Sequence, residues 1–267
     1  MLQEIRGRRE EIDRLFALTG RIDAAISVVC FRASLPFYCV PALSEGDRRI
    51  RVRALYHPLL LAPVPNSLET EGRVLLTGSN ASGKSTFLKA AALCALLSQT
   101  IHTAPAKEYA APYCRIYSSM ALRDDLLGGE SYFIVEIRSL KRILDATGAE
   151  SAAPVLCFVD EVLRGTNTVE RIAASSEILR GLALSGVLCF AATHDIELTR
   201  LLPPLYDNYH FTEQIENGDV YFDYRLRSGP AGSRNAIRLL ETMGFEESLT
   251  RRAEERAQTF LRTGEWK

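Results

Sequence analysis

The stretch that decides the fold is a glycine-containing loop with the sequence Gly78-Ser79-Asn80-Ala81-Ser82-Gly83-Lys84-Ser85-Thr86. It matches the pattern G-x-x-x-x-G-K-[ST] at every position. Residues 73–77 before it, with three successive apolar residues at their centre, predict a buried strand, and residues 85–99 after it have the pattern of a helix. A loop between a strand and a helix N-terminus directs backbone N–H groups and the positive end of the helix dipole at a bound phosphate. We therefore predict a phosphate-binding loop rather than an ordinary glycine-rich turn.

Two side chains of this loop have specific expected roles toward ATP and Mg²⁺. Lys84 would reach the β and γ phosphates, and the Ser85 hydroxyl would join the coordination shell of the metal ion. The backbone would surround the phosphates along the whole loop. The candidate nucleotide-binding residues here are Gly78, Ser79, Asn80, Ala81, Ser82, Gly83, Lys84, Ser85 and Thr86.

Two acidic residues follow a second apolar run. Residues 155–159 predict a buried strand, and Asp160 and Glu161 come directly after it. Because ligands of α/β proteins bind at the carboxyl ends of the strands, we predict that Asp160 holds Mg²⁺, directly or through water. Glu161 would polarise the attacking water. A helix cap is the alternative interpretation of such an acidic residue, and the phosphate loop favours the catalytic one.

A third apolar strand, residues 187–192, is followed by Thr193 and His194. His194 would sense the γ phosphate or the attacking water; a solvated histidine at a strand end is the alternative. The helical pattern of residues 168–184 lies between the second and third strands. Strand, helix and strand in this order predict right-handed crossovers and an α/β fold with a mainly parallel sheet flanked by helices. The three strand ends together predict a Mg²⁺-dependent nucleoside triphosphatase and leave open what its energy is used for.

The N-terminal part has a helical pattern over residues 1–31, with Gly20 as its one weak point. Such a helix does not bury its apolar stripe alone, so it needs a packing partner. Residues 49–55 alternate between polar and apolar like a strand. In the C-terminal part, Asn217-Gly218 predicts a hairpin, and residues 233–243 and 246–261 have helical patterns.

Composition restricts the class of protein further. The chain has 267 residues, with 32 Lys and Arg against 33 Asp and Glu, so its charge provides no general attraction to nucleic acid or anionic lipid. No apolar stretch approaches the roughly 20 residues of a membrane span, and the N-terminus is too charged for a signal peptide. The 6 cysteines form no C-x-x-C pair. We therefore expect reduced cysteines in the core of a cytoplasmic protein.

Several motifs together resemble the ATPase domain of the MutS mismatch-repair family. The resemblance runs from about residue 22 to the C-terminus. The string D-E-x-x-R-G-T, which begins at Asp160, and the downstream Thr193-His194 are the most specific parts. The segments that carry the resemblance are residues 22–27, 56–58, 77–89, 104–106, 124–126, 131–136, 160–168 and 192–194.

This resemblance implies an ABC-type P-loop ATPase that works as a homodimer with composite sites. It implies that Ser131 is presented across the interface to the γ phosphate of the other subunit, and Gly128-Gly129-Glu130-Ser131 looks like a diverged ABC signature. A helix N-cap is the alternative role for Ser131. The resemblance also implies that Asn80 contacts the phosphates or the catalytic water and that residues 63–66, including Asn66, border the adenine. The family's aromatic stacking residue is not evident in that loop.

The resemblance implies a division into three parts. Residues 1–45 would be the end of a lever helix and its connection, residues 46–230 the ATPase domain, and residues 231–267 a helix-turn-helix that holds the partner subunit. A plain pair of surface helices is the alternative for the last part. Ser79, Ala81 and Ser82 replace the Pro, Met and Gly usual in the family's loop.

Nothing before residue 22 could form the family's mismatch-reading, connector and clamp domains. We therefore expect either the C-terminal piece of a longer polypeptide or a shorter MutS-like group, and the unpartnered N-terminal helix favours the first. The expected function is ATP binding and hydrolysis that couples nucleotide state to dimerisation and to DNA handling by other parts. The alternatives are a nucleotide-gated clamp or interaction module, an SMC-like or transporter-type ABC ATPase and, least favoured, a small-molecule kinase.

Overall fold

The computed structural model describes residues 8–79, 82–120, 132–148, 153–216, 219–231 and 236–265. Its centre is a six-stranded sheet in the order β12-β9-β4-β8-β7-β6. Neighbouring strands pair in parallel except at the β12 edge, which confirms the expected parallel-rich sheet. The strands of this large sheet are β4 (Arg73–Thr77), β6 (Arg115–Ser119), β7 (Val155–Asp160), β8 (Leu188–Ala192), β9 (Asp207–His210) and β12 (Arg227–Ser228).

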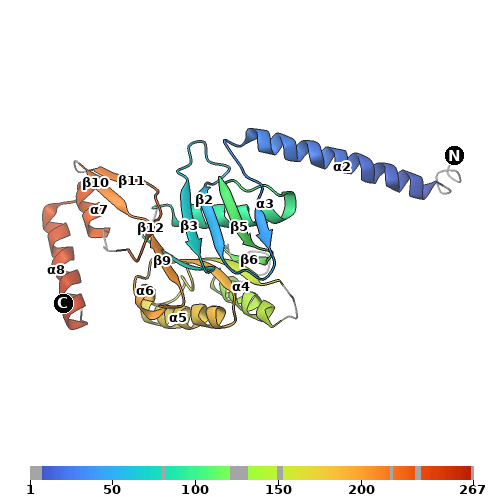
Figure 1. Ribbon diagram of the computed structural model, residues 1–267. Helices are drawn as coiled ribbons and strands as arrows, with labels where there is room; N and C mark the ends of the chain where they lie inside the picture. The colour runs from blue at the N-terminus through green and yellow to red at the C-terminus, as the bar shows by residue number, and fades with distance from the viewer. Residues whose placement is uncertain are drawn as a thin grey trace.

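A second, four-stranded sheet and a hairpin complete the β structure (Figure 1). The small sheet has the order β1-β5-β2-β3, and β2 confirms the strand expected near residues 49–55. The hairpin confirms the expected turn, although Asn217 and Gly218 themselves lie outside the described residues. The strands are β1 (Ala42–Ser44), β2 (Ile50–Leu55), β3 (Asn66–Thr70), β5 (Glu108–Pro112), β10 (Glu213–Glu216) and β11 (Asp219–Phe222).

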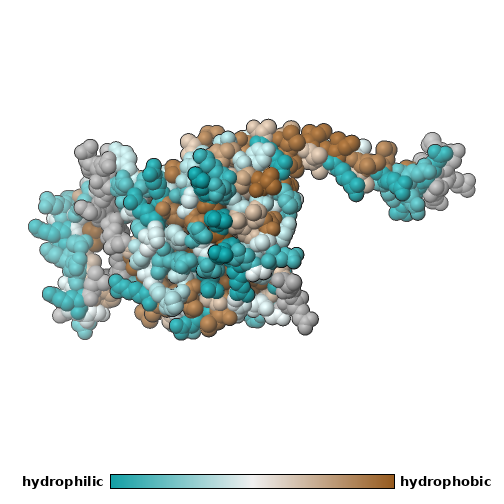
Figure 2. All heavy atoms as spheres, viewed as in Figure 1, coloured by the Kyte–Doolittle hydropathy of each residue, from teal (hydrophilic) through white to brown (hydrophobic). Residues whose placement is uncertain are grey.

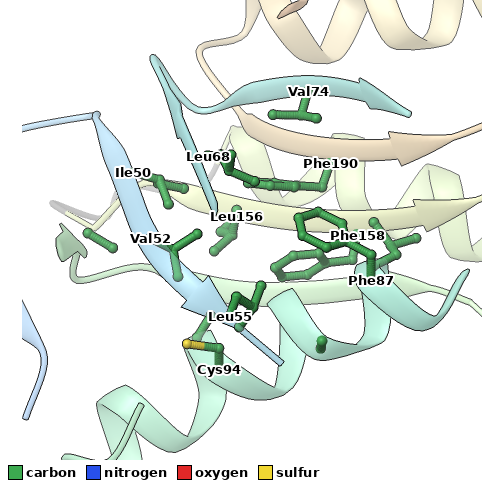
Figure 3. Packing of buried hydrophobic residues seen from close by; sticks show 14 of the residues in the cluster. Ile50, Val52, Leu55, Leu68, Val74, Phe87, Cys94, Leu156, Phe158 and Phe190 are labelled. Atoms are coloured by element: carbon green, nitrogen blue, oxygen red, sulfur yellow. The ribbon is translucent and has the colours of Figure 1, made fainter. Parts of the chain in front are cut away.

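Helix α3 (Lys84–Ile101) lies between the two sheets. The small sheet contributes Val52 and Leu55 to this part of the core, and the large sheet contributes Phe158 and Phe190 (Figure 3). Phe87 of α3 packs in the same cluster. The start of α3 is therefore held on two sides, next to the glycine-containing loop.

The other face of the large sheet is covered by helices α4 (Tyr132–Thr147), α5 (Thr168–Leu184) and α6 (Leu198–Leu201). Successive residues of a strand point to opposite faces. Phe158 accordingly joins the α3 side of the core, whereas Cys157 and Val159 join the α4 and α5 side. Both faces are covered, which explains why these strands are continuous apolar runs.

Helix α2 (Arg9–Ser34) extends away from the body of the molecule (Figure 1). Every residue of α2 is described and none is buried, so its apolar stripe is open to solvent, as Figure 2 shows. Gly20 does not interrupt the helix. At its last turn, the Arg32 guanidinium donates to the backbone oxygens of Ile101 and His102 and to the Thr103 hydroxyl. These bonds join the base of α2 to the end of α3.

The C-terminal helices are α7 (Ala236–Thr242) and α8 (Glu247–Thr263), which pack on each other. The turn between them contains Gly244 at φ +82°, a left-handed conformation that favours glycine. This confirms a helical pair at the expected place. Among the described helices, none is long and apolar enough to cross a membrane.

The cysteines are all free, as expected, but they are not all in the core. Cys94, Cys157 and Cys189 are buried, whereas Cys30 is exposed. The expectation of six core cysteines was therefore wrong for Cys30, because α2 packs against no other described element along most of its length.

Candidate functional site

A cavity of about 580 Å³ lies beside the start of α3. The carboxyl ends of β4, β8 and β7 meet next to it, since Leu76 pairs with Ala192 and Asp160 also pairs with Ala192. The cavity therefore occupies the edge of the sheet where α/β proteins bind ligands. Its lining includes Tyr56, His57, Pro63, Val64, Asn66, Ser79, Gly83, Lys84, Ser85, Thr86, Glu161, Phe211 and Tyr224.

Lys84 is the first residue of α3 and its side chain is directed at the loop before it. Only 5% of Lys84 is exposed, and its Nζ donates to the backbone oxygens of Gly78 at 2.6 Å and Ser79 at 2.7 Å. Burial lowers the pKa of this ammonium, while the nearby carboxylates of Glu161, Asp160 and Glu213 act in the opposite direction. A poorly hydrated cation is therefore ready to exchange two carbonyl partners for more strongly negative oxygens.

The loop conformation requires glycine at both ends. Gly78 has φ +140°, and a Cβ there would lie 2.4 Å from the backbone oxygen of Phe211. Gly83 has φ +108° and is followed by α3. Within the loop, the Ser79 hydroxyl donates to Glu213 Oε2 at 2.8 Å and the Ser82 hydroxyl donates to the Ser79 oxygen. Asn80 and Ala81 lie outside the described residues.

The acidic pair lies where the sequence predicted, at the end of β7. Asp160 is the last residue of the strand, and its Oδ1 atom is buried without a hydrogen-bond partner in the described part of the chain. Glu161 follows at φ +59°, and its backbone N–H donates to the Ala192 oxygen at 2.9 Å. A left-handed conformation at a residue other than glycine is strained and is commonly found at functional sites.

His194 and Arg164 lie on either side of the Glu161 carboxylate. Its Oε1 is 3.4 Å from Nδ1 of His194, and its Oε2 is 3.0 Å from Nε of Arg164. The contact with His194 is the main cause that lowers the pKa of Glu161, with Arg164 and Lys84 adding to it against the opposing effect of burial. Glu161 is therefore ionised at neutral pH and can accept a hydrogen bond.

Tyr224 also lines the cavity, and sequence reasoning missed it. Asn66 donates through Nδ2 to the Tyr224 oxygen at 2.9 Å and accepts at Oδ1 from the Leu226 N–H at 2.7 Å. The same Nδ2 also donates to the Val64 oxygen at 3.2 Å, so the Asn66 amide ties the backbone at Tyr224 to the segment that carries Val64. The Tyr224 ring also packs over Gly83, whose added Cβ would be 3.2 Å from it.

The donor set fits a divalent cation bound together with a phosphorylated ligand. Mg²⁺ prefers oxygen ligands and keeps several waters and phosphate oxygens in its shell. The Asp160 Oδ1 atom is buried without a partner among the described residues, and the Ser85 hydroxyl lines the adjoining cavity. Ser131 lies outside the described residues, so its position relative to this group remains a prediction from sequence.

The fold and cavity define an α/β protein whose parallel sheet brings a glycine loop, an acidic pair and a histidine together at neighbouring strand ends. A family model described as MutS domain V matches residues 74–261, and the chain belongs to the MutS family. It is 35% identical over 235 residues to the DNA mismatch repair protein MutS of Thermus thermophilus, covering 86% of this chain and 28% of that protein.

Two further MutS proteins are similar to this chain over most of its length. The DNA mismatch repair protein MutS of Natronomonas pharaonis is 34% identical over 253 residues, covering 89% of this chain. The DNA mismatch repair protein MutS 2 of Haloarcula marismortui is 30% identical over 280 residues, covering 94% of this chain. The chain spans 29% of the length of each of these two proteins.

Proposed function

We propose that this chain is the ATP-binding and hydrolysing domain of a MutS-like DNA mismatch repair protein, with a P-loop fold of ABC type. The observation that carries the proposal is that Lys84, Ser85 and Glu161 line the same cavity as Tyr224. A cavity lined by both a cationic loop and an aromatic side chain suits a nucleoside triphosphate.

In this proposal the phosphates lie along the loop of residues 78–86 and the base lies between Tyr224 and the residues near Val64. Backbone N–H groups at the start of α3 and the Lys84 ammonium stabilise the phosphate charge. The Mg²⁺ ion, held by Ser85 and Asp160, neutralises further negative charge when bound.

Hydrolysis is assigned to Glu161, which orients the attacking water. Because its pKa is lowered, its carboxylate is available as a hydrogen-bond acceptor at neutral pH. His194 holds one carboxylate oxygen in place from the neighbouring strand β8. Catalysis of this kind depends mainly on positioning and electrostatics, so small displacements of these groups reduce the rate strongly.

The wider assignments depend on the family. We propose that residues 46–230 form the ATPase domain, that Ser131 completes the site of a second copy and that residues 231–267 hold that copy. Residues 1–45, with α2, would transmit the nucleotide state to DNA-handling parts of the full protein. The mismatch repair named for the relatives supports DNA as the partner of that protein.

The first test is ATP binding and steady-state ATP hydrolysis by the wild-type chain and two variants. Lys84→Ala should abolish binding or turnover. Glu161→Gln should keep ATP bound and lower turnover by about 100-fold or more, because the amide orients water poorly. Lys89→Ala, on the exposed side of the same helix, is the matched control and should behave as wild type. Normal turnover by Glu161→Gln would refute the role of Glu161, and binding without turnover by the wild type would favour a nucleotide-gated module.

The second test is sedimentation velocity of the Glu161→Gln protein with Mg²⁺ and no nucleotide, ADP or ATP. A shift from monomer toward dimer with ATP, lost on adding Ser131→Arg, is the expected result. A monomer in every state would contradict the composite site.

A further inference from the structure

A buried carboxylate lies beside the candidate site without lining its cavity. Glu136 belongs to α4 and only 2% of it is exposed. Its Oε1 accepts the backbone N–H of Leu163 at 2.5 Å. Burial raises the pKa of this carboxyl group, while hydrogen bonds from the backbone of Leu163 and Arg164 act in the opposite direction. Burying a carboxylate is costly, so its presence calls for a specific reason.

The bonded amide belongs to the turn that carries Glu161. Both Glu161 and Leu163 have left-handed backbone conformations, at φ +59° and +57°. Such a conformation is strained at a residue other than glycine and persists only where its surroundings fix it. A carboxylate is a strong acceptor for a backbone N–H, so the bond from Leu163 to Glu136 compensates for this strain.

Two further contacts fix the same turn from the two neighbouring helices. Gly165 packs against the Phe133 ring of α4 so closely that an added Cβ would lie 3.1 Å from it. From α5, the Ser175 hydroxyl donates to the Val162 oxygen at 3.1 Å. Glu136 thus adds a carboxyl acceptor from α4 to a turn that is also held by aromatic packing and by α5.

We propose that Glu136 is a positioning residue that fixes the 161–165 turn, and thereby the direction of the Glu161 carboxylate, through its hydrogen bond to Leu163. The inference rests on the proposed hydrolysis and extends it to a residue outside the cavity. Since Ser131 precedes α4 directly in the chain, the same helix links the proposed interface serine to Glu161. A displacement of α4 would then alter the hydrolytic group without touching the nucleotide.

The test compares Glu136→Met, which removes the acceptor and keeps the length, with Glu136→Gln, whose amide oxygen still accepts the Leu163 N–H. Glu136→Met should lower kcat by about 10- to 100-fold, as expected for a misplaced catalytic group, with the Kd for ATP unchanged. Glu136→Gln should restore kcat to near the wild-type value. Ser139→Ala is the control. It removes a different buried polar group of α4, a hydroxyl that donates to the Ser118 oxygen, and it should keep kcat.

A second readout is independent of activity. Amide hydrogen exchange of folded, nucleotide-free protein should show faster exchange at Leu163 in Glu136→Met and wild-type protection in Glu136→Gln. Wild-type kcat in Glu136→Met, or equal loss of kcat in both variants, would overturn the positioning role. If the wild-type chain hydrolyses no ATP, the proposed function fails, while the exchange result still decides whether Glu136 fixes the turn.

Discussion

Arg171 and Asp195 join α5 to the end of β8 through a bidentate ion pair. Arg171 Nε lies 2.8 Å from Asp195 Oδ2, and Nη2 lies 2.7 Å from Oδ1. The two side chains are only 13% and 7% exposed. Asp195 follows His194 directly, so this pair fixes the backbone that presents His194 to Glu161.

The ion pair leads to a prediction about stability. Arg171→Ala should lower the free energy of unfolding by about 3 kcal/mol, because it leaves the Asp195 carboxylate buried without its partner. Replacing both partners, as in Arg171→Met with Asp195→Leu, should lose less than the sum of the single losses. Urea denaturation measures the free energy of unfolding of the single and double variants. Additive losses would show that the two side chains are not coupled.

A second prediction concerns the wall at Tyr224. Tyr224→Ala should weaken ATP binding by about 1–3 kcal/mol, the usual contribution of a base stacked on an aromatic ring, and Tyr224→Phe should bind as wild type. Inorganic triphosphate, which has no base, should bind both variants equally well. Titration calorimetry of the wild type and both variants, each with ATP and with triphosphate, measures these affinities. An equal loss for ATP and triphosphate would place Tyr224 at the phosphates.

The pH dependence of turnover tests the contact between His194 and Glu161. His194→Ala removes the main cause that lowers the pKa of Glu161, so this pKa should rise toward its ordinary value of 4.5. In the proposed mechanism, the ionised form of Glu161 is the active one. The acid limb of the kcat profile should therefore move to higher pH. His102→Asn, at the exposed end of α3, is the control and should keep the wild-type profile.

The same contact has a consequence for stability. A carboxylate with a lowered pKa in the folded state contributes stability that is present above its unfolded pKa and lost as the pH falls through its folded pKa. Unfolding of His194→Ala should thus depend less on pH below about 4.5 than unfolding of the wild type. If the free energy of unfolding of His194→Ala had the same pH dependence as that of the wild type, this would contradict the contact between His194 and Glu161.

Thiol labelling provides a fourth prediction. Maleimide at pH 7 should modify Cys30 rapidly, because it is exposed on α2. Burial raises the pKa of Cys114 to about 11, so this thiol should react much more slowly than Cys30, and the buried Cys94 should react only after denaturation. Mass spectrometry counts the adducts with time. Cys30→Ser should remove the fast phase, and slow modification of Cys30 in the folded protein would contradict the exposure of α2.

Local patterns were sufficient to predict the central strands and helices. Residues 73–77 and 168–184 have the same bounds as β4 and α5, because apolar runs and the Asn167 cap specify them without distant partners. The relative placement of the loop, Asp160 and His194 also followed from sequence, since parallel strands bring their carboxyl ends to one edge.

The features that the sequence did not predict depend on contacts between residues far apart in the chain, or on the absence of such contacts. Tyr224 reaches the cavity through its bond to Asn66, 158 positions earlier, and no local pattern signals that pairing. Glu136 looks like one charge among many on an amphipathic helix, and only the packing of α4 on the 161–165 turn buries it. The exposure of Cys30 was not predicted, because it follows from the absence of contacts along α2 among the described elements.

The bonds from Arg32 to the end of α3 give the molecule a mechanical property. α3 begins at the phosphate loop and ends where Arg32 binds the Ile101 oxygen, so a tilt of this one rigid helix reaches the base of α2. At 1.5 Å per residue, the 26 residues of α2 form an arm of about 39 Å. A rotation of about 10° at its base would move the far tip by about 7 Å. A small tilt of α3 would therefore become a large displacement at the free end of α2.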